Sequence, residues 1–106
     1  MPLKIRGRSD KNLKSIIQEL GKYESEHPHA NIEAYRQNSV SIRVRIIDPD
    51  FAGIEKADRH NTVWQILEKL PENVQSQISV LLLLTPAERK KSFASAEFDD
   101  PIRSKL

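Results

Sequence analysis

Residues 40–67, VSIRVRIIDPDFAGIEKADRHNTVWQIL, decide the fold because two different apolar spacings follow each other within them. The first half alternates with a period of two, which predicts a strand with one packed face and one solvated face. The packed row is predicted to be Val40, Ile42, Val44 and Ile46, and the solvated row Ser41, Arg43 and Arg45.

The second half of this stretch changes to the helical period after a turn. Gly53 permits a backbone turn that a Cβ would resist, and Phe51 is predicted to fill the gap between strand and helix. Asp58 is the predicted N-cap, and the helix should end before Pro71. Its apolar row is Val63, Ile66, Leu67 and Leu70.

Working outward, the same periodicities predict the remaining elements. An amphipathic helix is expected over about residues 10–24, capped by Ser9 or Asp10, and a short strand over residues 31–36. The apolar run at 78–84 predicts a third strand, and "PENVQSQI" before it a short turn with Pro71 at its first position. Thr85 and Glu88 have capping-box spacing, which predicts a last helix through about Phe93.

The predicted order is therefore α-β-β-α-β-α, in an α+β fold. A strand, a crossover helix and a further strand favour a parallel pair, so strand 40–46 should be central. We expect a two-layer sandwich in which a three-stranded mixed sheet carries helices on one face. Half of the leucines of Leu81–Leu84 would then face the other side, where the last helix or a second subunit must cover them. A homodimer joined over this strand is one expectation.

The length of 106 residues fits one domain. We expect a basic flexible arm at 1–9, a single domain at 10–93 and a flexible acidic tail at 94–106. The absence of Cys excludes disulfides and thiolate chemistry from this chain.

The expected location is the cytoplasm. There is no apolar run near the roughly 20 residues that span a bilayer, and the first ten residues lack the apolar core of a secretory signal. The last three residues, Ser104-Lys105-Leu106, match the peroxisomal address, which works only in a eukaryote, and we treat the match as coincidence.

With these elements in place, the stretch from Ile42 to Leu67 resembles the BolA family, whose motif is FxG, five residues, RH and an apolar helix. Here the motif residues are Phe51, Gly53, Arg59 and His60, and the similarity in element order extends over about residues 13–88. The resemblance implies a fold akin to the type II KH domain and a small, non-enzymatic regulatory or adaptor role. It also implies, in many members, a monothiol glutaredoxin partner sharing a [2Fe-2S] cluster, or DNA.

The sequence departs from the family at the cluster ligands. The resemblance places Ser79 where the family has a cluster-ligating His, and the shortened loop RQNSVS has neither His nor Cys. Because iron–sulfur clusters require thiolate or imidazole ligands, we expect no cofactor. His27 and His29 lie before the first strand, where no third ligand is apparent from the sequence, so no metal is expected either. The carboxylates of Asp48, Asp50, Glu55 and Asp58 are assigned to turns and caps.

Three functions remain open, none of them catalytic, because the sequence has no nucleophile elbow, phosphate loop or metalloprotease helix. The favoured one is an adaptor that contacts a partner protein through the four motif residues, with His60 either a partner contact or a plain surface residue. The second is a KH-like binder of DNA or RNA, although Lys56 stands where a GxxG loop needs its second Gly. Its residues would be Arg36, Arg43, Arg45, Lys4, Arg6 and Arg8. The third is a glutaredoxin partner that shares a cluster through His60 and a further ligand that the sequence does not identify.

Overall fold

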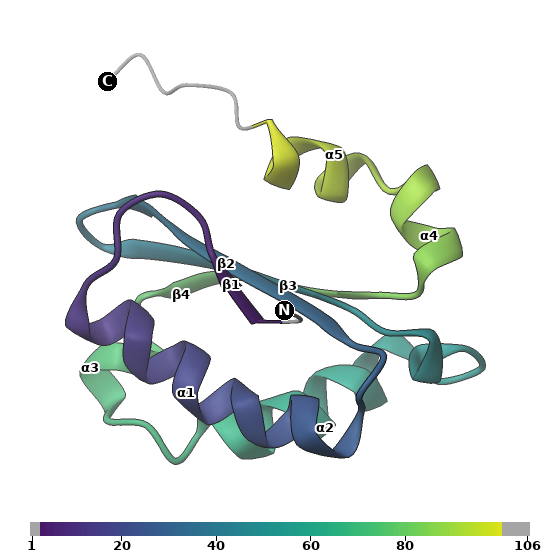
Figure 1. Cartoon of the computed structure of the whole chain (residues 1–106), viewed down its shortest axis with the longest axis horizontal. Helices are drawn as coiled ribbons and strands as arrows, with labels where there is room; N and C mark the ends of the chain where they lie inside the picture. Colours follow the sequence, from purple (N-terminus) through teal and green to yellow (C-terminus); the bar gives the residue numbers. More distant parts are fainter. Residues whose placement is uncertain (1–2, 101–106) are drawn as a thin grey trace.

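The computed structural model describes residues 3–100, which form a four-stranded sheet with helices on both faces (Figure 1). The elements follow one another as β1 (Leu3–Ile5), α1 (Lys11–Glu26), β2 (Asn31–Asn38), β3 (Ser41–Ile47), the 3-10 helix η1 (Pro49–Phe51), α2 (Lys56–Leu67), α3 (Glu72–Gln75), β4 (Ile78–Leu84), α4 (Pro86–Lys91) and α5 (Phe93–Asp99).

The sheet is mixed and has the order β1-β2-β3-β4. β1 runs parallel to β2, β2 antiparallel to β3, and β3 parallel to β4. Val44 lies between Ala34 on one neighbouring strand and Leu81 on the other. The α+β class, the central position of β3 and the parallel crossover through α2 are therefore confirmed.

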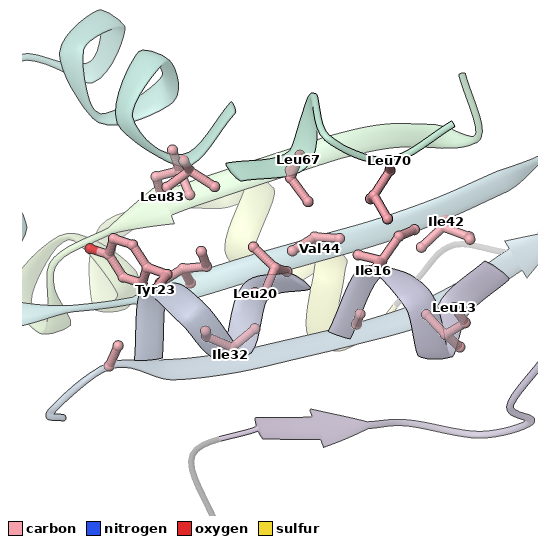
Figure 2. Close-up of a cluster of buried hydrophobic side chains, with 14 of the residues drawn as sticks. Leu13, Ile16, Leu20, Tyr23, Ile32, Ile42, Val44, Leu67, Leu70 and Leu83 are labelled. Atoms are coloured by element: carbon pink, nitrogen blue, oxygen red, sulfur yellow. The ribbon is translucent and has the colours of Figure 1, made fainter. Parts of the chain in front are cut away.

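α1 and α2 cover one face of the sheet and enclose the main core. In Figure 2 the side chains of Leu13, Ile16 and Leu20 point from α1 toward the strands that carry Ile32 and Val44. All five are fully buried, as the helical and strand periods predicted. Val40 is the exception to the predicted packed row, because it lies in the turn before β3 and is 67% exposed.

The first strand was missed by the sequence analysis. Part of the segment expected as a flexible basic arm forms β1, in which Leu3 and Ile5 pack against the core. The pairing continues beyond the strand, where the backbone N–H of Arg6 donates to the carbonyl of Ala34 at 2.9 Å. β1 was not predicted because two apolar residues are too few to show a period. The sheet therefore has one strand more than the predicted three.

The second correction concerns the face of the sheet expected to be solvated. α5 lies over this face, on the side opposite α1 and α2 (Figure 1), so helices are not confined to one face. The side chain of Phe98 is buried there, and Arg43 and Arg45 are buried as well. Residues 94–99, expected to be an acidic tail, belong to this helix. The Ser104-Lys105-Leu106 tripeptide lies outside the described residues.

The helix ends test the predicted caps. Asp10 caps α1 by accepting from the N–H of Leu13 at 3.0 Å, and Thr85 and Glu88 form the predicted capping box of α4. Asp58 does not cap α2, which begins at Lys56, and lies in its first turn instead. The predicted helix corresponds to α4, which ends at Lys91, two residues before the expected end near Phe93. Ser92 then caps a further helix, α5, by accepting from the N–H of Ser95 at 3.0 Å, and the sequence analysis did not predict this helix.

The start of α3 also differs from the expected turn, since Pro71 precedes the helix as its N-cap. As for membranes, none of the helices within residues 3–100 combines the length and the apolar character that a bilayer crossing requires.

Candidate functional site: the corner between β3, α2 and β4

The motif stretch forms the corner through which the chain leaves β3 and enters α2. Phe51 ends η1 and is buried, with its ring centroid 5.9 Å from that of Tyr23 in α1. Gly53 has φ +79°, in the left-handed region that favours glycine. The structure therefore gives both residues the packing and turning positions that the sequence analysis predicted for them.

Arg59 is the link between this corner and the end of β4. Although charged, it is only 4% exposed. Its Nε donates to the carbonyl of Ile54 at 2.8 Å, and its Nη1 to the carbonyl of Leu83 at 3.0 Å. Both Nη atoms donate to the carboxylate of Glu88 in α4, at 2.6 and 3.1 Å. One guanidinium thus joins the loop after η1, α2, β4 and α4, which requires the forked geometry of Arg.

Glu88 is held by two elements at once. It accepts from Arg59 and, through the capping box, from the backbone N–H of Thr85 at 2.9 Å. The hydrogen bonds from Arg59 and then from Thr85 lower the pKa of Glu88 from 4.5 to about 2. The carboxylate therefore stays charged wherever the fold is intact above this pH.

This lowered pKa predicts an acid-sensitive contribution to stability. Because the folded pKa of Glu88 lies below its unfolded value, the stabilisation is complete above about pH 4.5 and is lost as the pH falls toward about 2. We expect the free energy of unfolding of Glu88→Gln to fall less than that of the wild type over this interval. Urea unfolding followed by circular dichroism at pH 6, 4 and 3 measures the difference, and Glu24→Gln in α1 is the control. Equal pH dependence of Glu88→Gln and the wild type would contradict the assignment.

His60 is separated from the other motif residues. It lies on the exposed side of α2, where its ring stacks on Trp64 with centroids 5.8 Å apart and planes inclined by 15°. The structure thus brings Phe51, Gly53 and Arg59 together at the corner and leaves His60 facing outward. Its role as a partner contact stays a prediction.

Four of the five arginines proposed for nucleic-acid binding form ion pairs with carboxylates of the same chain. Arg45 is 3% exposed, and its Nη2 lies 2.8 Å from Asp99 and 3.2 Å from Glu33. The corresponding partners are Glu97 for Arg43, Asp10 for Arg36, and Glu33 for Arg6. Lys4 and Arg8 are exposed, but most of the predicted basic surface is turned inward and neutralised. The geometry therefore gives this alternative little support, because phosphate binding requires accessible cations.

One polar cluster was not foreseen from the sequence. His27 at the end of α1 meets Asp48 and Asp50 of the corner: its Nδ1 lies 2.9 Å from Oδ2 of Asp50 and 3.5 Å from Oδ2 of Asp48. The hydroxyl of Tyr23 donates to the same Asp48 oxygen at 2.6 Å. More than twenty residues separate His27 from these carboxylates, so their proximity could not be predicted from local sequence patterns.

The fit of an iron–sulfur cluster rests on Ser79, the second residue of β4. Its side chain is a hydroxyl, and its Oγ lies 3.4 Å from the carbonyl oxygen of Ile42, to which it donates. A hydroxyl does not replace the thiolate or imidazole that such clusters need. The residues at this position therefore do not fit the cluster that the family resemblance implies.

Comparison with known proteins rests on structure, since no protein-family model matches the chain and no curated protein matches its sequence. The BolA domain of SufE1 from Arabidopsis thaliana superposes with a TM-score of 0.55 at 19% identity, covering 76% of this chain and 99% of that domain. BolA1 from Arabidopsis thaliana superposes with a TM-score of 0.53 at 18% identity, covering 76% of this chain and 98% of that one. At such low identity the likeness concerns the architecture alone, and it shows that the chain has a BolA-like fold.

Proposed function

We propose that this chain is a non-enzymatic BolA-like adaptor that binds a partner protein along the open edge of β4. The observation that carries the proposal is the position of this strand. β4 has seven residues without a charge, and it pairs with β3 on one side, whereas no strand within residues 3–100 pairs with its other side. Proteins usually protect such an edge with charges, Pro or a bulge, because its free backbone groups can pair with another strand.

The open part of the edge is its first five residues. The carbonyl of Leu83 points away from β3 and accepts a hydrogen bond from Arg59. This carbonyl is therefore not available to pair with a partner strand at the C-terminal end of β4. From Ile78 to Leu82 the side chains are partly or fully exposed, with Ser79 the most accessible of them. A partner that adds an extended segment here would gain main-chain hydrogen bonds and apolar contacts along β4, as in other cases of strand addition.

The remainder of the site favours a binding role over a catalytic one. The buried arginine side chains of the corner and sheet, those of Arg43, Arg45 and Arg59, hold carboxylates of neighbouring elements. Such pairs connect secondary-structure elements and leave those groups unavailable for proton transfer to a substrate. A monothiol glutaredoxin remains a candidate partner on the family resemblance. The absence of a suitable ligand at Ser79 leads us to expect any such complex to contain no [2Fe-2S] cluster.

The test places a charge on the edge without disturbing the core. Ser79→Lys is compared with Gln65→Lys, which adds the same charge to the exposed side of α2. We expect the wild type and Gln65→Lys to recover the same partner from a cell extract, and Ser79→Lys to recover at least about tenfold less, because a lysine disfavours edge pairing. The recovered protein is then purified and titrated against all three chains, so that direct binding is measured.

Two results would contradict the proposal. Equal affinity of Ser79→Lys and Gln65→Lys for the purified partner would remove β4 as the binding surface. Light scattering that shows a concentration-dependent dimer, abolished by Ser79→Lys, would instead identify a second copy of the chain as the occupant of the edge.

The expected lack of a cluster has its own test. A colourless complex with a monothiol glutaredoxin agrees with this expectation, and a visible iron–sulfur absorption spectrum contradicts it.

A further inference from the structure

We propose that His27, Asp48 and Asp50 form a binding site for a divalent transition-metal ion of the Zn²⁺ type. This site is separate from the β4 edge, so it goes beyond the adaptor function and does not depend on it. The three side chains come from the end of α1 and from the corner after β3, and each offers one ligand atom. These atoms all lie within 4.8 Å of one another.

The spacing of the ligand atoms matches a coordination shell. Nitrogen and carboxylate ligands lie about 2.0–2.2 Å from Zn²⁺, so neighbouring ligands of one ion are about 3.0–3.5 Å apart. The distances from Nδ1 of His27 are 2.9 Å to Asp50 and 3.5 Å to Asp48. Small side-chain rotations would therefore admit an ion between the three groups, with water completing the shell.

Asp48 gives the site a rigid and electrostatically unbalanced centre. Its side chain is 0% exposed. The other buried charged residues, Arg43, Arg45 and Arg59, each lie at ion-pair distance from a carboxylate of another element. Within residues 3–100, the one basic group at ion-pair distance from Asp48 is the imidazole of His27. A buried carboxylate without a permanent cation is costly, and a bound metal ion would remove this cost.

The carboxylate of Asp48 is also oriented as a ligand would be. Oδ1 accepts from the backbone N–H of Asp50 at 2.9 Å, and Oδ2 accepts from the hydroxyl of Tyr23 at 2.6 Å. Tyr23 is itself buried in the core cluster, so its hydroxyl is held against this carboxylate. Hydrogen bonds of this kind fix the direction of metal-binding carboxylates.

His27 is held by the end of α1. Its backbone N–H donates to the carbonyls of Tyr23 and Glu24, and its ring stacks on that of Tyr23 with centroids 4.1 Å apart. Both His27 and Asp50 are partly exposed, which leaves the cluster open to an entering ion and to water ligands. The backbone and the stacked ring therefore restrict the direction in which Nδ1 can point.

The donor set selects among metals. One imidazole nitrogen with two carboxylate oxygens suits Zn²⁺ and related transition ions. Ca²⁺ requires six to eight oxygen ligands, and Mg²⁺ is also an oxygen-seeking ion, so neither benefits from the imidazole. The bound ion would tie the end of α1 to the corner after β3, and thus join the helical layer to the sheet.

The experiment titrates the metal-free, untagged full chain with Zn²⁺ by calorimetry, and with Co²⁺ by visible absorption. The test variants are His27→Gln and Asp50→Asn. The chain has two further histidines, so His29→Gln and His60→Gln are matched controls. We expect one Zn²⁺ per chain in the wild type and both controls, and at least about tenfold weaker binding in each test variant. The Co²⁺ spectrum should show nitrogen coordination, and this signal should disappear in His27→Gln.

Circular dichroism and thermal melting first establish that every variant is folded, so that lost binding is not lost structure. The proposal is wrong if the wild type binds no Zn²⁺, if His27→Gln or Asp50→Asn binds as tightly as the wild type, or if His29→Gln abolishes binding. It is equally wrong if Mg²⁺ binds as strongly as Zn²⁺, since the carboxylates alone would then account for the ion. In any of these cases the three residues form an ion-pair cluster without a metal.

Discussion

Phe98→Ala is expected to lower the free energy of unfolding by about 3 kcal/mol or more, because it removes the side chain that anchors α5 to the sheet. Phe98 is 1% exposed, and its ring meets that of Tyr35 edge-on with centroids 4.8 Å apart. The guanidinium carbon of Arg45 lies 4.6 Å from the same ring, and that of Arg6 lies 5.1 Å from it. Truncation therefore leaves a cavity and also exposes two arginines to water.

The matched control comes from the same helix. Phe93 is 87% exposed, so Phe93→Ala should change the free energy of unfolding by no more than about 0.5 kcal/mol. Urea denaturation followed by circular dichroism and by the fluorescence of Trp64 measures both variants. Hydrogen exchange of the α5 amides then distinguishes local release of the helix from global unfolding. Equal losses in the two variants would mean that α5 does not dock through Phe98.

Arg59→Met is expected to lower the free energy of unfolding by about 2–4 kcal/mol, because it removes the donors that hold the corner together. The carbonyl of Leu83 loses its partner in a buried position, and Glu88 loses the bidentate contact that lowers its pKa. Methionine retains much of the aliphatic volume, so the loss reports the hydrogen bonds more than the packing.

Arg89→Met in α4 is the control, since Arg89 is half exposed and lies 3.8 Å from Asp99. Its expected effect is below about 1 kcal/mol, the usual range for an exposed ion pair. Arg59→Lys is a second test: one ammonium group cannot reproduce the forked contacts, so it should recover only part of the stability. Chemical denaturation measures all three variants. Full stability of Arg59→Lys would show that the charge alone matters at this corner.

Local patterns in the sequence were sufficient to predict the central strand of the sheet and the helices that cover its main face. The alternation through Ile42, Val44 and Ile46 predicted a central strand, and the spacing of Leu13, Ile16 and Leu20 predicted the helix that covers it. The capping residues Asp10 and Thr85 and the turn at Gly53 were also readable, because each depends on residues no more than a few positions away. Where the local signal was short, as in β1, or ambiguous, as at Asp58, the prediction failed.

The pairing of charges was decided by contacts that no local period records. Arg43 and Glu97 are 54 positions apart, as are Arg45 and Asp99, yet α5 brings both pairs together over the sheet. For this reason a row of arginines that looked solvated, and suited to nucleic acid, is buried against acidic side chains. The same holds for His27 with Asp48 and Asp50.

Periodicity and capping act between neighbours in the chain, so the residues alone determined the strands and helices of the core layer and the turn into α2. The docking of α5, the four-way contact of Arg59 and the grouping of His27 with two carboxylates depend on which surfaces meet after the chain has folded. These contacts depend on the burial of Phe98, Phe51 and Tyr23 against side chains that are distant in the sequence. Only the tertiary structure therefore shows them.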